Sequence, residues 1–143
     1  MTALFTIVLL FAQPAPQSLE QVRSEANPEH RARAAVEFAA TAERNAETAY
    51  YKGDMKSVAA ELNSMAEAAE IARKALQQTG KSPSGHPGPF KYGELRTQEI
   101  LVRLNDLEHK MDEDEREVIT APKAKLQEIH DLWFDGIMSG KRK

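Results

Sequence analysis

The sequence predicts an all-α protein, folded as an antiparallel four-helix bundle that is made of two helical hairpins. Three observations support this prediction. Apolar residues recur at alternating steps of three and four in four long segments, which is the period of a helix that buries one face. Short turn sequences separate the two segments of each pair, so neighbouring helices must run antiparallel. No segment has the alternating pattern that is typical of a β-strand.

The first hairpin, residues 27–80, has the most regular pattern. Its second helix carries an unbroken apolar heptad at Met55, Val58, Leu62, Met65, Ala69, Ala72 and Leu76. Its first helix has only alanine at the matching positions, which are Ala32, Ala35, Ala39, Ala42, Ala46 and Ala49. Because alanine is small, we expect the two backbones to lie toward the short end of the ~8–10 Å range of helix separations.

The ends of these helices carry residues that favour caps and turns. Asn27 and Pro28 predict a helix start, because Asn accepts a hydrogen bond from a first-turn amide and Pro is tolerated at the first helical position. Gly53 suits the left-handed residue just past a helix end, and Asp54 is placed to cap the next helix. Gly80 predicts where that helix ends.

The second hairpin is predicted over residues 94–140, after a loop at 80–93. Three prolines and four glycines in the fourteen residues of this loop predict a break between helices. We expect Phe90 and Tyr92 to hold the end of the loop against the bundle. The helix that follows carries a stripe at Thr97, Ile100, Leu104, Leu107 and Met111, which Leu95 and Leu101 widen.

An acidic run at 112–117 predicts the connection to the last helix, because acidic side chains favour the amino end of a helix. We expect the last helix to begin near Ile119 or Thr120. Pro122 is tolerated only in the first turn, where the amide donors have no partner within the helix. The stripe of this helix is Leu126, Ile129, Trp133 and Ile137.

The amino-acid composition limits the classes of function that we expect. The chain has 143 residues, which fits one domain, and a net charge of −3, which argues against a dedicated nucleic-acid binder. Cysteine is absent, so neither disulfides nor thiolate chemistry is available. No catalytic motif and no phosphate-binding glycine loop occurs. We therefore expect a protein that is not an enzyme and uses no cofactor.

The amino end differs from the rest of the chain. Residues 1–17 contain an apolar run at 4–12 followed by small residues and prolines, which predicts a signal peptide or, failing that, a disordered amino end. The run is shorter than the about 20 residues that cross a bilayer, so no stable span is expected after signal removal. We expect export to the periplasm or medium, with an uncleaved, membrane-associated amino end as the alternative. Ser18 caps a short helix and opens the bundle domain, 18–140.

The turn of the first hairpin is similar to that of a tetratricopeptide repeat. The similarity lies in residues 49–54, Ala-Tyr-Tyr-Lys-Gly-Asp, together with Ala59, Ala75 and Leu76. It occurs once, without the roughly 34-residue period, the Trp or the terminal Pro of that family. The resemblance implies a scaffold of stacked hairpins as an alternative to the bundle.

A second alternative is a metal- or small-ligand-binding four-helix protein. Asp106 and His109 lie three residues apart on one predicted helix, and His130 lies on the next. Metal-binding bundles place such residues on facing helices. Because the predicted seam is apolar rather than acidic, we assign no metal ligand.

The preferred hypothesis is an exported helical bundle that binds another protein or itself. Neighbouring residues lie about 100° apart on a helix, so Leu132, Trp133 and Phe134 cannot all face one core. We expect Trp133 to fill the end of the bundle, and Leu132, Phe134 and Met138 to be available to a partner, because aromatic side chains often anchor interfaces. In the alternative, the loop at 80–93 covers them.

Overall fold

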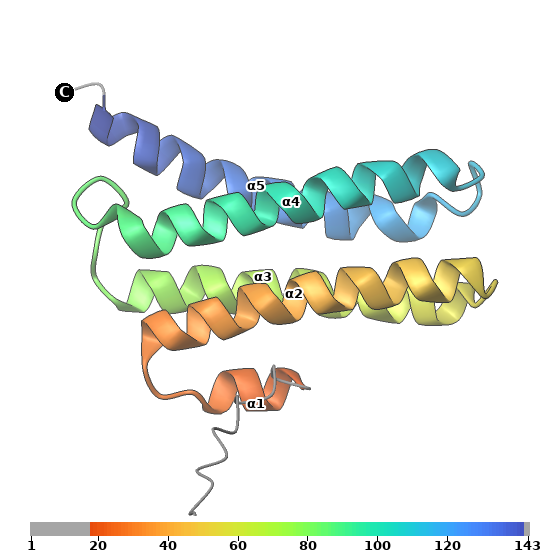
Figure 1. Cartoon of the computed structure of the whole chain (residues 1–143), viewed down its shortest axis with the longest axis horizontal. Helices are drawn as coiled ribbons and strands as arrows, with labels where there is room; N and C mark the ends of the chain where they lie inside the picture. The colour runs from red at the N-terminus through yellow and green to blue at the C-terminus, as the bar shows by residue number, and fades with distance from the viewer. Residues whose placement is uncertain (1–17, 142–143) are drawn as a thin grey trace, which may run out of the picture.

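The computed structural model describes residues 18–141, and within them every regular element is an α-helix (Figure 1). Five helices follow one another: α1 (Leu19–Ser24), α2 (Pro28–Tyr51), α3 (Met55–Gln78), α4 (Pro87–Lys110) and α5 (Glu117–Lys141). The prediction of an all-α fold is confirmed. The predicted signal peptide, residues 1–17, lies outside the described residues.

The helix ends of the first pair, α2 and α3, form where the sequence predicts them. The side chain of Asn27 accepts a hydrogen bond from a first-turn amide of α2 at 3.1 Å. Gly53 has a φ of 72°, which lies in the left-handed region that glycine tolerates. Asp54 accepts a hydrogen bond from the amide of Ser57 at 3.1 Å and so caps α3. The turn between the two helices is therefore only three residues long, 52–54.

The seam between α2 and α3 is the most extensive helix contact in the described chain. All six predicted alanines of α2 are buried. On α3, the heptad is buried from Val58 to Leu76, and Met55 at its start is partly buried. Because methyl groups face larger aliphatic side chains, the seam closes without a bulky residue on α2. The predicted seam is confirmed.

The segment between α3 and α4 is shorter than predicted. The sequence predicts a loop over 80–93, but α4 begins at Pro87, so the connection is 79–86. Pro87 and Pro89 are the first and third residues of α4, where amide groups have no partner within the helix. Neither proline therefore costs a helix hydrogen bond, and the prediction is wrong because it weighed the number of prolines rather than their positions. Phe90, predicted to lie in the loop, is a buried residue of α4.

The second pair, α4 and α5, buries larger side chains. The predicted stripes of both helices are buried, with Trp133 2% exposed. Leu101 is buried as predicted, whereas Leu95 is 60% exposed, so its assignment to the stripe is wrong. Leu95 lies about 200° around the helix from Thr97, which places it on the outer face.

α5 begins earlier than predicted. Its first residue is Glu117 rather than Ile119 or Thr120, so Pro122 is the sixth residue and lies beyond the first turn. The missing amide of Pro122 leaves the carbonyl of Val118 without its usual helix donor. Pro122 is buried, and burial of its ring offsets part of this cost.

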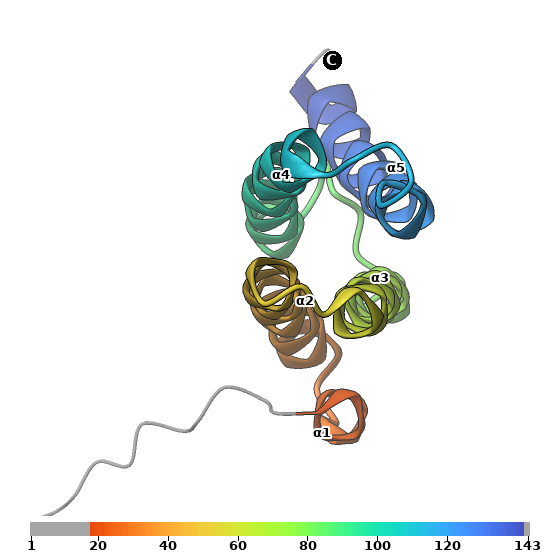
Figure 2. The same cartoon turned by 90° about the vertical axis from the view of Figure 1, so that its right-hand side faces the viewer.

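The four long helices surround a shared interior (Figure 2). α2 packs against α3 and α4, and α5 packs against α3 and α4, which is the arrangement of a helical bundle. α1 lies outside this group, against α2 and α3, where Val22 is fully buried. Within residues 18–141, none of the helices combines the length and hydrophobicity needed to cross a membrane.

Candidate interaction surface

Exposed apolar side chains gather on the second pair of helices. The large apolar side chains that are exposed in residues 18–141 are Tyr51, Leu95, Val102, Leu132 and Phe134. Only Tyr51 belongs to the first pair, and its hydroxyl accepts a 2.5 Å hydrogen bond from Lys110. Single exposed apolar residues are normal on a protein surface, but a concentration of them on one side marks a candidate interaction site.

The three α5 residues predicted to meet a partner do not form one patch. Phe134 is 43% exposed, Leu132 is 55% exposed and Met138 is partly buried. Phe134 and Met138 lie four residues apart, on the flank of α5 that faces α4. Leu132 lies about 160° around the helix from Phe134, on the opposite flank.

The α3–α4 loop, residues 79–86, covers a part of α5 other than Leu132 and Phe134. Pro83 and Ser84 lie against Gly136 and Gly140, and a Cβ atom at Gly136 would lie 2.7 Å from Cγ of Pro83. The lack of a side chain at Gly136 therefore admits the proline ring. Because Leu132 and Phe134 stay exposed, the alternative in which the loop covers them is wrong.

Phe134 and Met138 line one side of an open hollow of about 200 Å³ between α4 and α5. Lys91, Glu94, Leu95 and Ile137 complete its lining. An apolar depression with a few charged groups beside it matches the composition of protein interfaces, where an apolar centre has a polar rim.

His130 supports Phe134 from within the bundle. The two rings stack with their centroids 6.0 Å apart and their planes inclined by 15°. His130 is 7% exposed; its Nε2 atom lies 3.1 Å from Oε1 of Glu94, and its Nδ1 atom lies 3.0 Å from Oδ1 of Asp131. The hydrogen bond with His130 lowers the pKa of Asp131. Since Glu94 belongs to α4, this contact ties the two helices together beside the exposed phenyl ring.

The outer face of α4 adds a second apolar element. Leu95 and Val102 are 60% and 50% exposed. They are seven residues apart and so differ by only about 20° around the helix. Leu95 borders the hollow toward α5, while Val102 lines another open hollow of about 350 Å³ toward α2. The stripe is therefore a ridge with a depression on each side, a shape against which another helix can pack.

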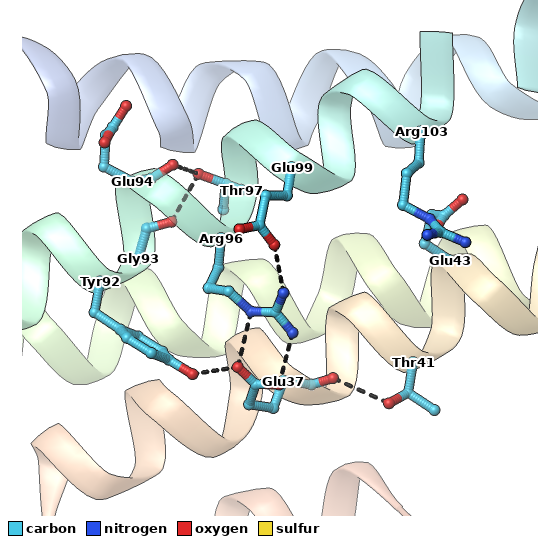
Figure 3. A network of polar contacts seen from close by, with 10 residues as sticks. All are labelled: Glu37, Thr41, Glu43, Tyr92, Gly93, Glu94, Arg96, Thr97, Glu99 and Arg103. Carbon is cyan, nitrogen blue, oxygen red and sulfur yellow. Dashed lines mark hydrogen bonds and ion pairs between the residues drawn. The ribbon is translucent and has the colours of Figure 1, made fainter. Parts of the chain in front are cut away.

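Ion pairs hold α4 against α2 below this ridge (Figure 3). Arg96 lies between two carboxylates, with Nη2 2.8 Å from Oε2 of Glu37 and Nη1 2.5 Å from Oε2 of Glu99. The hydroxyl of Tyr92 also donates to Glu37. The hydrogen bonds from Arg96 hold the pKa of Glu37 below its usual range, although partial burial opposes this shift.

Glu43 is a fully buried acid in the same α2–α4 contact. Arg103 donates from Nε to Oε2 of Glu43 at 2.8 Å and from Nη2 to Glu47 at 3.0 Å. Oε1 of Glu43 has no hydrogen-bond partner among the described residues. Burial raises the pKa of Glu43, and the interaction with Arg103 offsets only part of that shift.

This polar contact between α2 and α4 was not predicted from the sequence. Two features of the sequence were available to indicate it. Glu43 lies four residues after Ala39 and three before Ala46, so it shares the buried side of α2 with the alanine seam. Arg96 and Arg103 are seven residues apart and therefore lie on one side of α4. Which acid meets which arginine depends on how the helices are placed relative to each other.

The residues of the metal-binding alternative lie apart. Asp106 and His109 are exposed on α4, and a ring nitrogen of His109 lies 2.6 Å from the carbonyl oxygen of Asn105. His130 is buried beside Glu94, which precedes Asp106 by twelve residues, or about 18 Å along the helix. In residues 18–141, no group of three or more His, Asp or Glu side chains is placed to hold a metal ion.

No protein-family model, no curated protein and no solved structure matches this chain.

Proposed function

We propose that this chain is an exported, non-enzymatic helical bundle that binds another protein, or a copy of itself, through the outer surface of α4 and α5. The distribution of exposed apolar side chains carries this proposal, because three of the five large ones in the described chain, Leu95, Val102 and Phe134, lie on the outer face of α4 and on the flank of α5 beside it. Apolar surface left in water costs about 25 cal/mol per Å², a cost that a partner removes when it covers the surface.

In this proposal the four long helices form an antiparallel bundle of two hairpins, α2–α3 and α4–α5. The three-residue turn at 52–54 and the short connection at 111–116 support that topology. The first hairpin acts as a scaffold that holds α4 through the Glu37–Arg96 and Glu43–Arg103 pairs. A rigid surface loses less conformational entropy on binding than a mobile one.

Export forms the second part of the proposal and is tested separately. The apolar run at 4–12 supports it. We expect the mature protein in the envelope or medium to begin near Gln13. Cell fractionation and amino-terminal sequencing check this expectation, and an intact Met1 in the membrane fraction would favour the uncleaved, membrane-associated alternative.

Affinity capture from envelope extract tests the binding surface, with the full-length tagged chain as bait. Phe134→Ala is expected to reduce recovery of the bound protein about tenfold or more, because truncating a central aromatic anchor of an interface costs roughly 2 kcal/mol. Tyr51→Ala is the matched control, since it truncates an exposed aromatic residue on the first pair. Circular dichroism must show that both variants fold. Equal losses from Phe134→Ala and Tyr51→Ala would show that the surface is wrongly placed.

A further inference from the structure

We propose that the surface of α4 docks against α4 of a second copy of this chain, in an antiparallel contact around a two-fold axis. This inference rests on the proposed function and names its partner. The residues that carry it are the exposed outer positions of α4: Lys91, Leu95, Gln98, Val102 and Asp106. They fall within about 80° of one another around the helix, so they form one stripe.

The stripe is self-complementary. Its centre lies between Gln98 and Glu99, and Leu95 and Val102 are equally distant from that centre along the chain. When two copies of α4 lie antiparallel about this centre, Leu95 of one copy meets Val102 of the other, and every contact occurs twice. Val102 of the second copy then reaches the hollow beside Leu95 that Phe134 and Met138 line.

The charges at the ends of the stripe follow the same symmetry. Lys91 and Asp106 are also equally distant from the centre, so the antiparallel contact brings Lys91 of one copy to Asp106 of the other. A parallel contact would instead face Lys91 with Lys91 and Asp106 with Asp106. Because like charges across an interface are unfavourable, the charge pattern selects the antiparallel arrangement.

Lys91 and Asp106 are also the two charged side chains of α4 that form no hydrogen bond or salt bridge within residues 18–141. The other charged side chains of this helix are each engaged by a group of the same chain: Glu94, Arg96, Glu99, Arg103, Glu108, His109 and Lys110. Asp106 has only a Coulombic interaction with Lys110, whose ammonium group already donates a hydrogen bond to Tyr51. Lys91 and Asp106 therefore lie at the two ends of the exposed apolar stripe, where a second copy supplies each with a salt-bridge partner.

The contact is small. Lys91 and Asp106 are fifteen residues apart, so the stripe is about 22 Å long. A single helix of that length buries an area near the lower limit of specific interfaces, about 1,000 Å² in total. We therefore expect a reversible dimer that forms at micromolar concentrations rather than an obligate one.

Sedimentation velocity of the full chain, from about 1 µM to about 1 mM, tests the proposal by charge exchange. Lys91→Asp and Asp106→Lys should each weaken self-association about tenfold or more, because each places like charges together at both ends of the contact. The double variant Lys91→Asp/Asp106→Lys should recover it. An equimolar mixture of the two single variants should form a mixed dimer, since every acid in that pairing meets a lysine.

Lys56→Asp, the same charge change at an exposed position of α3, is the control and should leave the dimer unchanged. Failure of both the double variant and the mixture to associate would overturn the antiparallel contact. A chain that stays monomeric at every concentration would overturn the dimer altogether. If capture that depends on Phe134 persists in that case, the proposed function stands with a different protein as the partner. Loss of capture as well would remove both proposals.

Discussion

The two pairs of helices bury side chains of different size in their contacts. α2 and α3 meet through alanine on one side and larger aliphatic side chains on the other, and their contact is the most extensive in the described chain. α4 and α5 share a less extensive contact, which is filled by leucine, isoleucine and one buried tryptophan. The first pair exposes one large apolar side chain, Tyr51, whereas the second exposes four.

The difference in side-chain size predicts which kind of substitution each pair should tolerate. Small side chains let two backbones approach closely, so the seam of the first pair has little room for added atoms. Larger side chains fill more of the contact between α4 and α5, so removal of one of them leaves a cavity. The first pair should therefore tolerate enlargement poorly, while the second should tolerate truncation poorly.

Truncation of Trp133 should have the largest effect. Trp133 is 2% exposed, and its ring lies so close to α4 that a Cβ atom at Gly93 would be 2.6 Å from it. Trp133→Ala should lower the free energy of unfolding by about 3–5 kcal/mol, because it leaves a large cavity in the second pair. Urea unfolding measures this change.

The neighbouring residue supplies the control for this prediction. Phe134→Ala removes an aromatic ring from the same turn of α5, but from a position that is 43% exposed. It should cost about 1 kcal/mol, well below the cost of Trp133→Ala, since nearly half of this residue is already exposed to water. Equal costs for the two variants would show that the second pair does not depend on one buried large side chain.

Enlargement of Ala39 tests the first pair. Ala39 is 1% exposed in the seam with α3, and Ala39→Leu should lower the free energy of unfolding by about 1–3 kcal/mol, because the added carbons force the two backbones apart. Ala60→Leu makes the same change at an exposed position of α3 and should stay within about 0.5 kcal/mol of the wild type. Thermal and urea unfolding compare the two variants. If Ala39→Leu were neutral, the seam would contain space that close packing excludes.

The contrast between the pairs also explains which parts of the fold the sequence predicted. The seam of the first pair was predictable, because an unbroken heptad opposite an alanine stripe leaves one arrangement for both helices. The start of α4 was not, because prolines that usually break a helix fit without cost when they occupy its first turn. Leu95 was assigned to the core from its apolar character alone, although its angle on the helix placed it outside.

The candidate surface was predictable only in part. Phe134 followed from three consecutive apolar residues, a pattern in which one helix cannot bury all three. Leu132 and Met138 are six residues apart, so their separation of about 120° around α5 also followed from the sequence. The arrival of Leu95 beside Phe134 depends instead on how α4 and α5 face each other. The acids that meet Arg96 and Arg103 depend in the same way on the placement of α2 against α4.

The smallest expected effect concerns Glu43, the buried acid that joins α2 of the first pair to Arg103 of the second. Burial raises the pKa of Glu43 above its ordinary value of 4.5, so the folded protein binds this proton more tightly than the unfolded chain does. The stability that the protonated carboxyl contributes is fully present below pH 4.5 and is lost as the pH rises through the raised pKa. Glu43→Gln avoids that loss and keeps an acceptor for Arg103.

We therefore expect Glu43→Gln to be more stable than the wild type near pH 7, by up to about 1 kcal/mol, with a difference that shrinks as the pH falls through the raised pKa of Glu43 and is smallest below 4.5. Urea unfolding over this range of pH measures the difference. Glu47→Gln removes a partly exposed acid from the same arginine and should change stability by less than about 0.5 kcal/mol. If Glu43→Gln were instead less stable near pH 7, the attraction between Glu43 and Arg103 would outweigh the cost of burial. The two pairs would then be joined by charge as well as by apolar packing, and high salt should weaken their contact.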